Sequence, residues 1–458
     1  MTDQGELRAA ALSGPVTEGR MVAPVCPLPV DLAAHGYVEE EFFASGAAAA
    51  FAPGSPLTSD GRWQLVPAGK AEYRTRIVVR RPAEADGASG TVLVEWCNVS
   101  GGVEAAADWS YLHEEILRRR HAYVAVSAQA FGVDGGTPLL DVPGVRPRGG
   151  LVAARPERYG SLVHPGDAFS YDVFTQIGLA LRAPAAASPL GGIPVGRVVA
   201  MGESQSAFFL TTYVNGPHHG ADVYDGFLVH SRGGSSASLD GFPRGGARWG
   251  MPPAVRIRED VGVPVFIFET ETDVGARLDF APARQPDTDR IRTWEVAGTA
   301  HADAYLVGAY AHLIGCDFPV NRGPHHEVAQ AALHALVRWA GGGEPPPLAP
   351  PIALASTSPP VIARDALGNA LGGARTPDVD VPVAALSGEA PEGASELCQL
   401  FGSTAPFEGA MLRRLYRSEA GYRAAYVEAL DAAVAAGFVL DDDRHAMLAR
   451  AGEVVFPP

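Results

Sequence analysis

Cysteine is scarce in this chain, and its spacing is as informative as its number. The 458 residues contain four cysteines, Cys26, Cys97, Cys316 and Cys398, and no two of them form a CxxC pair. Zinc sites and small disulfide-stapled domains depend on closely paired cysteines at regular spacings. We therefore expect neither a zinc site nor a disulfide framework.

Positive charge is also in short supply. Lys and Arg number 36 against 52 Asp and Glu, which gives a formal net charge of −16. Nucleic acid binding needs clustered basic side chains that neutralise phosphates. We expect no nucleic acid partner, and we interpret the acidic surface as a solubility feature.

Long apolar runs and a targeting signal are missing as well. No stretch of 18 apolar residues without charge occurs, and "MTDQGELRAAALSGPVTEG" lacks a basic segment followed by an apolar one. Transmembrane helices and secretory signal peptides need these features. We expect a soluble, cytoplasmic protein with no membrane partner.

The residues that are present suit a large α/β core. Apolar residues make up 47% of the chain. Strand patterns alternate with helix patterns at 108–120, 170–183 and 325–340, and the strands are expected at 71–82, 90–96, 121–129, 197–201, 224–230, 263–270 and 291–298. This alternation predicts a mostly parallel sheet with helices on both faces.

Composition divides the chain into three segments. Residues 1–70 are rich in Ala, Gly and Pro, and we expect an irregular N-terminal segment packed on the core. Residues 71–340 form the predicted core. The proline-rich stretch at 341–351 opens a C-terminal extension, 341–458, which we expect to pack on the core through helices at 406–417, 419–437 and 442–451.

One short stretch, "VVAMGESQSAFF" at 198–209, carries the first chemical signal. It matches the G-x-S-x-G nucleophile elbow around Ser204, with Ser206 in place of the last glycine. Small flanking residues are required because a tight strand-to-helix turn leaves no room for larger side chains. Residues 233–237 fit an equally loose template, but no strand runs into them. Ser204 is therefore the predicted nucleophile.

A serine nucleophile needs a histidine base, which comes last in chain order in this class of fold. His301 lies in a small-residue loop just after a predicted strand. His325 and His326 open a predicted helix, and we expect them to be exposed. His301 is the predicted base.

The acid that orients the histidine should follow the preceding strand. "VPVFIFETETDV" offers Glu269, Glu271 and Asp273. We favour Asp273, which lies clear of the strand, and keep Glu271 as the alternative. Its role is to hold His301 in one tautomer and to stabilise the imidazolium.

An oxyanion hole requires backbone N–H groups aimed at the developing charge. We expect one donor at Gln205, directly after the nucleophile, and the other at Val99 or Asn98 in "EWCNVSGG". Spacing does not choose between those two. No HExxH motif or clustered ligand set occurs, so no metal or cofactor is expected.

Longer motifs add a resemblance to a known family. "VEWCNVSGG", "DWSYLHEEILRRRHAYVAVSAQ", "RYGSLVHPGDAFSYDVFTQ", "GESQSA", "RTWEVAGTAHAD", "RDALGNALGGARTP" and "LFGSTAPF" resemble the bacterial family called "alpha/beta hydrolase domain". The resemblance implies an α/β-hydrolase fold in which the C-terminal part belongs to the same structural unit. It also implies a triad of Ser204, an acid after the seventh strand, and His301.

These residues predict a serine esterase that acts on a small-molecule carboxylic ester through an acyl-enzyme. An acyltransferase or amidase with the same triad is one alternative, and a catalytically silent binding protein is another. The natural substrate, the acyl-chain preference, the oligomeric state and whether the C-terminal extension forms a lid are left open.

Overall fold

A nine-stranded sheet forms the centre of the computed structural model, which describes residues 7–26, 28–140, 142, 149–182, 188–241 and 250–457. The strand order is β1-β2-β3-β5-β4-β6-β7-β8-β9. Strands β4 to β9 are parallel, as predicted, and they are β4 (Thr91–Trp96), β5 (Ala122–Val126), β6 (Arg197–Glu203), β7 (Gly226–His230), β8 (Val265–Thr270) and β9 (Ile291–Val296). Parallel strands place all their carboxyl ends along one edge, where ligands bind in open α/β sheets.

Helices cover both faces of this sheet. On one face α5 (Ser170–Arg182) and α6 (Gln205–Asn215) contribute to the first core cluster, and on the other α1 (Ala107–Arg118) and α9 (His325–Ala340) contribute to the second. Successive strand residues point to opposite faces; accordingly Val92 and Val94 of β4 belong to the first cluster and Leu93 to the second. The unbroken apolar runs of the predicted strands are explained by this double burial. The predicted helices are confirmed, except that residue 183 lies outside the described residues.

The N-terminal segment differs from the prediction. Residues 1–70 were expected to be irregular, but they supply β1 (Ala11–Ser13), β2 (Tyr37–Pro53) and the start of β3 (Leu65–Pro82). β2 and β3 form a long antiparallel ribbon, which joins the parallel strands where β3 pairs with β5. Alanine and glycine have a low preference for strands, so the composition of β2 did not predict a strand. Pairing with the whole length of β3 overrides this local preference.

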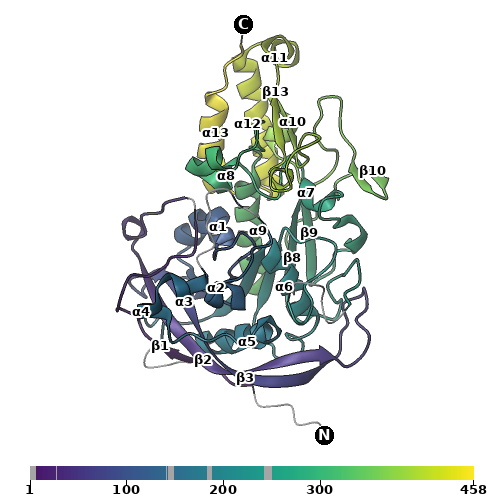
Figure 1. Cartoon of the computed structure of the whole chain (residues 1–458). Helices are drawn as coiled ribbons and strands as arrows, with labels where there is room; N and C mark the ends of the chain where they lie inside the picture. The colour runs from purple at the N-terminus through teal and green to yellow at the C-terminus, as the bar shows by residue number, and fades with distance from the viewer. Residues whose placement is uncertain are drawn as a thin grey trace.

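The C-terminal helices lie at one end of the molecule (Figure 1). They are α11 (Gly409–Tyr416), α12 (Glu419–Ala436) and α13 (Arg444–Gly452), close to the predicted ranges. Arg450 of α13 is 2.5 Å from Glu327 of α9, and Arg118 of α1 is 2.5 Å from Asp443. These ion pairs tie the extension to the helices that cover one face of the sheet. The three-segment division itself stays a prediction.

The remaining elements are short. They are α2 (Ala130–Asp134), α3 (Gly150–Ala154), α4 (Pro156–Tyr159), α7 (Glu271–Val274), α8 (Ala304–Val307), α10 (Pro377–Asp380), the 3-10 helices η1 (Ala33–His35), η2 (Asp167–Phe169), η3 (Ala281–Ala283), η4 (Gly308–Leu313), η5 (Cys398–Leu400) and η6 (Asp441–Asp443), and the hairpin strands β10 (Leu354–Thr357), β11 (Pro360–Ile362), β12 (Ala384–Ser387) and β13 (Ser403–Pro406). Within the described ranges, we find no helix with the length and apolar character that crossing a membrane requires.

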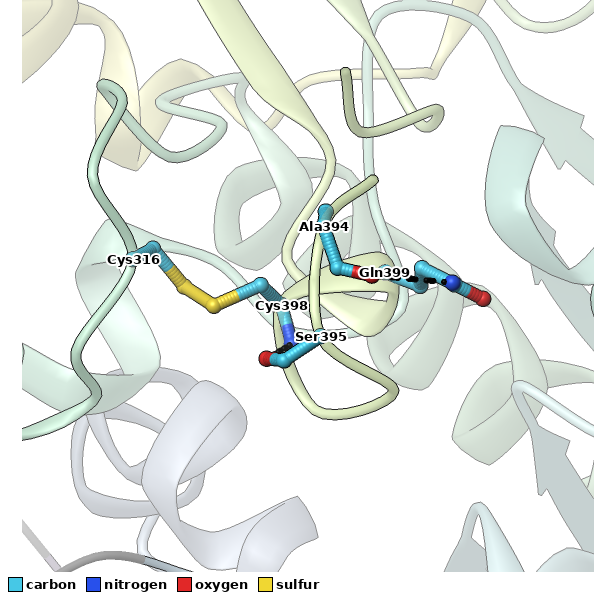
Figure 2. The surroundings of a disulfide bond; sticks show 5 residues. All are labelled: Cys316, Ala394, Ser395, Cys398 and Gln399. Carbon is cyan, nitrogen blue, oxygen red and sulfur yellow. Dashed lines mark hydrogen bonds between the residues drawn. A yellow bond between two sulfur atoms is a disulfide. The ribbon is translucent and has the colours of Figure 1, made fainter. Parts of the chain in front are cut away.

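A disulfide joins Cys316 to Cys398 and corrects the expectation drawn from cysteine spacing (Figure 2). The two residues are 82 positions apart, and the fold brings their Cα atoms to 5.7 Å. Sequence spacing carries no information about such a pair, because tertiary packing alone sets the distance. Around it, Ser395 Oγ accepts the Cys398 N–H, and the Gln399 side chain donates to the Ala394 carbonyl. Cys26 and Cys97 are free thiols.

Candidate active site

Ser204 occupies a strained turn between β6 and α6. Its φ of 56° and ψ of −120° lie outside the regions that non-glycine residues favour. A Cβ at Gly202 would come within 2.9 Å of the Ser206 Cβ, so the turn accepts only small residues at these two positions. The serine in place of the last glycine fits for the same reason. The sequence rule for the elbow is thus a packing rule in this molecule.

The turn brings Ser204 to the residues predicted as its partners. His301 Nε2 is 2.8 Å from Ser204 Oγ, and His301 Nδ1 is 2.6 Å from Asp273 Oδ1. Asp273 is fully buried, and its other oxygen accepts both the backbone N–H and the hydroxyl of Thr270, each at 2.7 Å. Three residues far apart in sequence therefore form one hydrogen-bonded chain.

Of the two acids left open, Asp273 contacts His301 and Glu271 does not. Glu271 turns away from the histidine and accepts the N–H groups of Gly298, at 2.6 Å, and Gly388, at 3.1 Å. Arg364 lies 3.0 Å from the same carboxylate. Through these contacts Glu271 links the loop that precedes His301 to the C-terminal extension. Glu269 is buried within β8, where its carboxyl oxygens have no partner among the described residues.

Glu203 is a site residue that the sequence analysis missed. Its Oε1 is 3.5 Å from His301 Nε2, on the same side of the imidazole as Ser204 Oγ. Burial raises the pKa of Glu203 to about 7, partly offset by the attraction of His301. An acidic residue directly before the elbow serine was the available signal.

The electrostatics of the site stabilise the imidazolium form of His301. Burial disfavours the imidazolium, but Asp273 and, to a lesser degree, Glu203 outweigh burial and raise the pKa of His301. A neighbouring carboxylate stabilises the positive charge that a general base acquires when it takes a proton. The site is therefore arranged to stabilise the proton that His301 would take as a base.

The three oxyanion candidates lie around the same turn. The Asn98 N–H is engaged by the Ala105 carbonyl at 3.0 Å, and its side chain donates to the Glu203 carbonyl at 3.2 Å. The Val99 N–H donates to Gln205 Oε1 at 3.0 Å. The Gln205 N–H lies in the first turn of α6, where backbone donors have no acceptor within the helix. Both loop N–H groups are thus hydrogen-bonded in the free protein, Asn98 to a backbone carbonyl and Val99 to a side chain, and the two candidates stay open.

An apolar pocket of about 220 Å³ opens on Ser204 and His301. Its walls come from the loop after β4, from the segment around α8 and from η5, and they include Val103, Leu140, Leu306, Val307, Leu397, Leu400 and Phe401. Cys398 lies between these last residues, so the disulfide anchors one wall of the pocket. Such a pocket suits a small apolar group.

His325 is a second departure from the sequence analysis. It was expected to be exposed at the start of a helix, but it is fully buried against Tyr111, His230 and Phe268. His326 is largely buried too, with its ring stacked on Tyr305. Helix α9 begins under the loops at the carboxyl edge of the sheet, a position that local sequence does not reveal.

Comparison with known proteins adds a family. The model of a family described as "Alpha/beta hydrolase domain" matches residues 12–449. No curated protein matches the chain.

Some solved structures are similar to this chain at low identity. A protein described as a dienelactone hydrolase from Klebsiella pneumoniae subsp. pneumoniae MGH 78578 is 11% identical, with 65% of this chain and 98% of that chain covered and a TM-score of 0.35. XC6422 from Xanthomonas campestris, described as an a/b serine hydrolase without lid, is 13% identical, with 58% and 89% covered and a TM-score of 0.29. A fungal esterase from Rhizomucor miehei is 11% identical, with 67% and 85% covered and a TM-score of 0.35. These likenesses are too distant to carry an argument about chemistry.

Proposed function

The chain belongs to the alpha/beta hydrolase domain family, and from this premise we propose that it is a serine esterase. In this proposal it cleaves a carboxylic ester of a small molecule through an acyl-enzyme on Ser204. The observation that carries the proposal is the chain Ser204–His301–Asp273, with contacts of 2.8 and 2.6 Å, at the floor of an apolar pocket.

Acylation begins with proton transfer from Ser204 to His301. As Ser204 Oγ attacks the carbonyl carbon of the ester, His301 Nε2 takes its proton, and Asp273 stabilises the imidazolium. When the tetrahedral intermediate collapses, the bond to the alcohol breaks. The alcohol oxygen then takes the proton from His301, and the acyl group remains on Ser204.

Deacylation repeats these steps with water. The water oxygen attacks the acyl carbon while His301 Nε2 takes a proton from the water. Collapse of the second intermediate releases the carboxylic acid and returns a proton from His301 to Ser204 Oγ. The ester and water are consumed, the alcohol and acid are formed, and the enzyme is restored.

The oxyanion formed in each half-reaction needs two donors. We assign them to the N–H groups of Gln205 and Val99. The Gln205 side chain accepts the Val99 N–H at 3.0 Å in the free protein, so the substrate oxygen replaces a carbonyl oxygen already held there. The Gln205 side chain must therefore move aside when the substrate binds, while the backbone N–H groups themselves stay in place as the charge develops.

The pocket indicates the class of ester. Its volume of about 220 Å³ is below the usual range of drug-sized ligand sites, and its walls are mostly apolar. A short, uncharged acyl or alcohol group fits this space. Acetate and butyrate esters are therefore suitable probes.

The test is hydrolysis of p-nitrophenyl acetate and butyrate by the wild type, Ser204→Ala and His301→Ala. We expect each variant to lose at least about 10⁴-fold in kcat/KM, because the nucleophile and base act as one unit. A fluorophosphonate should label the wild type and not Ser204→Ala. Turnover that survives in Ser204→Ala, or a wild type that neither turns over nor is labelled, would contradict the proposal.

A further inference from the structure

A second acid–histidine chain lies beneath the candidate active site. Asp108 Oδ1 is 2.8 Å from His230 Nδ1, and His230 Nε2 is 2.7 Å from His325 Nε2. His325 Nδ1 is 3.1 Å from the Ala300 carbonyl oxygen. All three side chains are fully buried, and none lines the pocket at Ser204.

This chain touches both loops that carry the proposed nucleophile and base. The backbone carbonyl of His230 accepts the Ser204 N–H at 2.9 Å. At the other end, Ala300 is the residue directly before His301. Helices α1 and α9 thus reach the two catalytic loops through one line of hydrogen bonds, Asp108–His230–His325.

The direction of these hydrogen bonds follows from the Ala300 carbonyl, which can only accept a hydrogen bond. The Ala300 carbonyl requires a proton on His325 Nδ1. A neutral His325 then has a bare Nε2, so the proton of the next bond belongs to His230 Nε2. A neutral His230 therefore presents a bare Nδ1, and the proton of the last bond belongs to the Asp108 carboxyl group.

Counting protons gives the same result. Three hydrogen bonds need three protons, while two neutral histidines and an ionised Asp108 supply only two. The third proton is on Asp108 or converts one histidine to imidazolium. In a fully buried site the neutral arrangement is favoured, because an imidazolium and a carboxylate would both lose their hydration.

We propose that Asp108, His230 and His325 are positioning residues for Ser204 and His301, and that a proton on the Asp108 carboxyl group completes their hydrogen-bonded chain. The inference rests on the proposed function for the identity of the residues that are positioned. The protonation pattern itself is independent of it.

The groups facing the chain agree with a neutral arrangement. From β4, Glu95 accepts the N–H groups of Asp108 and Trp109, and burial together with Asp108 raises the pKa of Glu95 to about 8. Burial raises the pKa of Asp108 well above its usual range and lowers that of His230 to about 4.

The remaining charged neighbours act on the two histidines. Burial lowers the pKa of His230 and outweighs Glu203 and Asp273, which raise it, while His301 adds to the lowering. Burial lowers the pKa of His325 well below its usual range. His230 adds to this lowering, and His301 and His326 contribute less. Both histidines are therefore neutral near pH 7.

The first test compares Asp108→Asn with Asp108→Ala. The side-chain amide introduced by Asp108→Asn can donate to His230 Nδ1 as a protonated carboxyl group does, so kcat should stay within about threefold of the wild type. Asp108→Ala leaves the chain open, and we expect kcat to fall about 10- to 100-fold with little change in KM, because small displacements of catalytic groups are costly. If Asp108→Asn falls as far as Asp108→Ala, the proposal is overturned.

The second test needs no turnover and separates this inference from the proposed function. Histidine-selective ¹⁵N NMR distinguishes the two neutral tautomers from imidazolium, with signals assigned from His230→Gln and His325→Gln variants. We expect His230 protonated at Nε2 and His325 at Nδ1 near pH 7. An imidazolium at either residue, or a proton on His230 Nδ1, would overturn the assignment even in a protein that hydrolyses esters.

Discussion

Two hydrogen-bonded lines of aspartate and histidine side chains lie within this molecule, and they differ in the group at which they end. In one, Asp273 and His301 lead to a serine hydroxyl beside a pocket. In the other, Asp108, His230 and His325 lead to a backbone carbonyl and are fully buried. A hydroxyl can give up its proton and react, whereas a carbonyl can only accept a hydrogen bond.

The acids of the two chains also differ. Asp273 receives two hydrogen bonds from Thr270 in addition to the contact with His301, so donors surround it. Asp108 Oδ2 has no partner among the described residues. Donors favour a carboxylate, and burial without donors favours the neutral acid. The same acid–histidine pair therefore suits a base in one place and a positioning role in the other.

The largest expected effect comes from Asp273→Asn, and the same change at Asp108 serves as its control. In Asp273→Asn, Thr270 still donates to the amide oxygen, so the NH₂ group faces His301 Nδ1. The proton of His301 then moves to Nε2, which can no longer accept the Ser204 proton, and we expect kcat to fall about 10⁴-fold.

The matched control is Asp108→Asn, for which we expect kcat to fall by about threefold or less. Steady-state kinetics with p-nitrophenyl butyrate measures both variants. Equal losses would remove the distinction between the two chains.

A smaller effect is expected from the disulfide, which touches neither chain directly. The double variant Cys316→Ser/Cys398→Ser should lower the free energy of unfolding by about 2–4 kcal/mol, because the oxidised chain cannot open the loop between the two residues when it unfolds. Leu397, Leu400 and Phe401 line the pocket, so KM should rise more than kcat falls. Urea unfolding and kinetics measure the two quantities.

Cys26→Ser is the control, since Cys26 is a free thiol. A double variant as stable as this control would show that the linkage does not form in the native protein. Cysteine pairs persist mainly in oxidising compartments. A cytoplasmic location therefore stays a prediction, and the disulfide weighs against it.

The smallest effect is a displacement of the pH profile by Glu203→Gln. A protonated His301 cannot accept the Ser204 proton, so kcat/KM rises as the pH passes upward through the pKa of His301. That pKa is raised by Asp273 and Glu203 against the opposing effect of burial. Removing the Glu203 charge lowers it, and the plateau should be reached at a lower pH than in the wild type.

The profile is measured as kcat/KM from pH 5 to 9. Glu114→Gln is a suitable control, because Glu114 is a half-exposed residue of α1 that does not line the pocket. A profile that does not move, or that moves to higher pH, would show that Glu203 does not act on His301.

Local sequence was sufficient wherever one segment carried the whole signal. The apolar runs of β4 to β9 and the helix patterns of α1, α5 and α9 predicted the parallel sheet and its covering helices, because the alternation of strand and helix leaves few ways to pair them. The small residues at Gly202 and Ser206 predicted the turn at Ser204, since the steric limit acts between neighbours in the chain.

Tertiary structure decided everything that depends on residues distant in sequence. It placed Asp273 rather than Glu271 against His301, formed the Cys316–Cys398 disulfide and made the N-terminal β2 a strand paired with β3. It also placed His325 against the loop that carries His301. In each case a hydrogen bond or covalent bond depends on a distance of a few ångströms between segments, and only the packed chain fixes that distance.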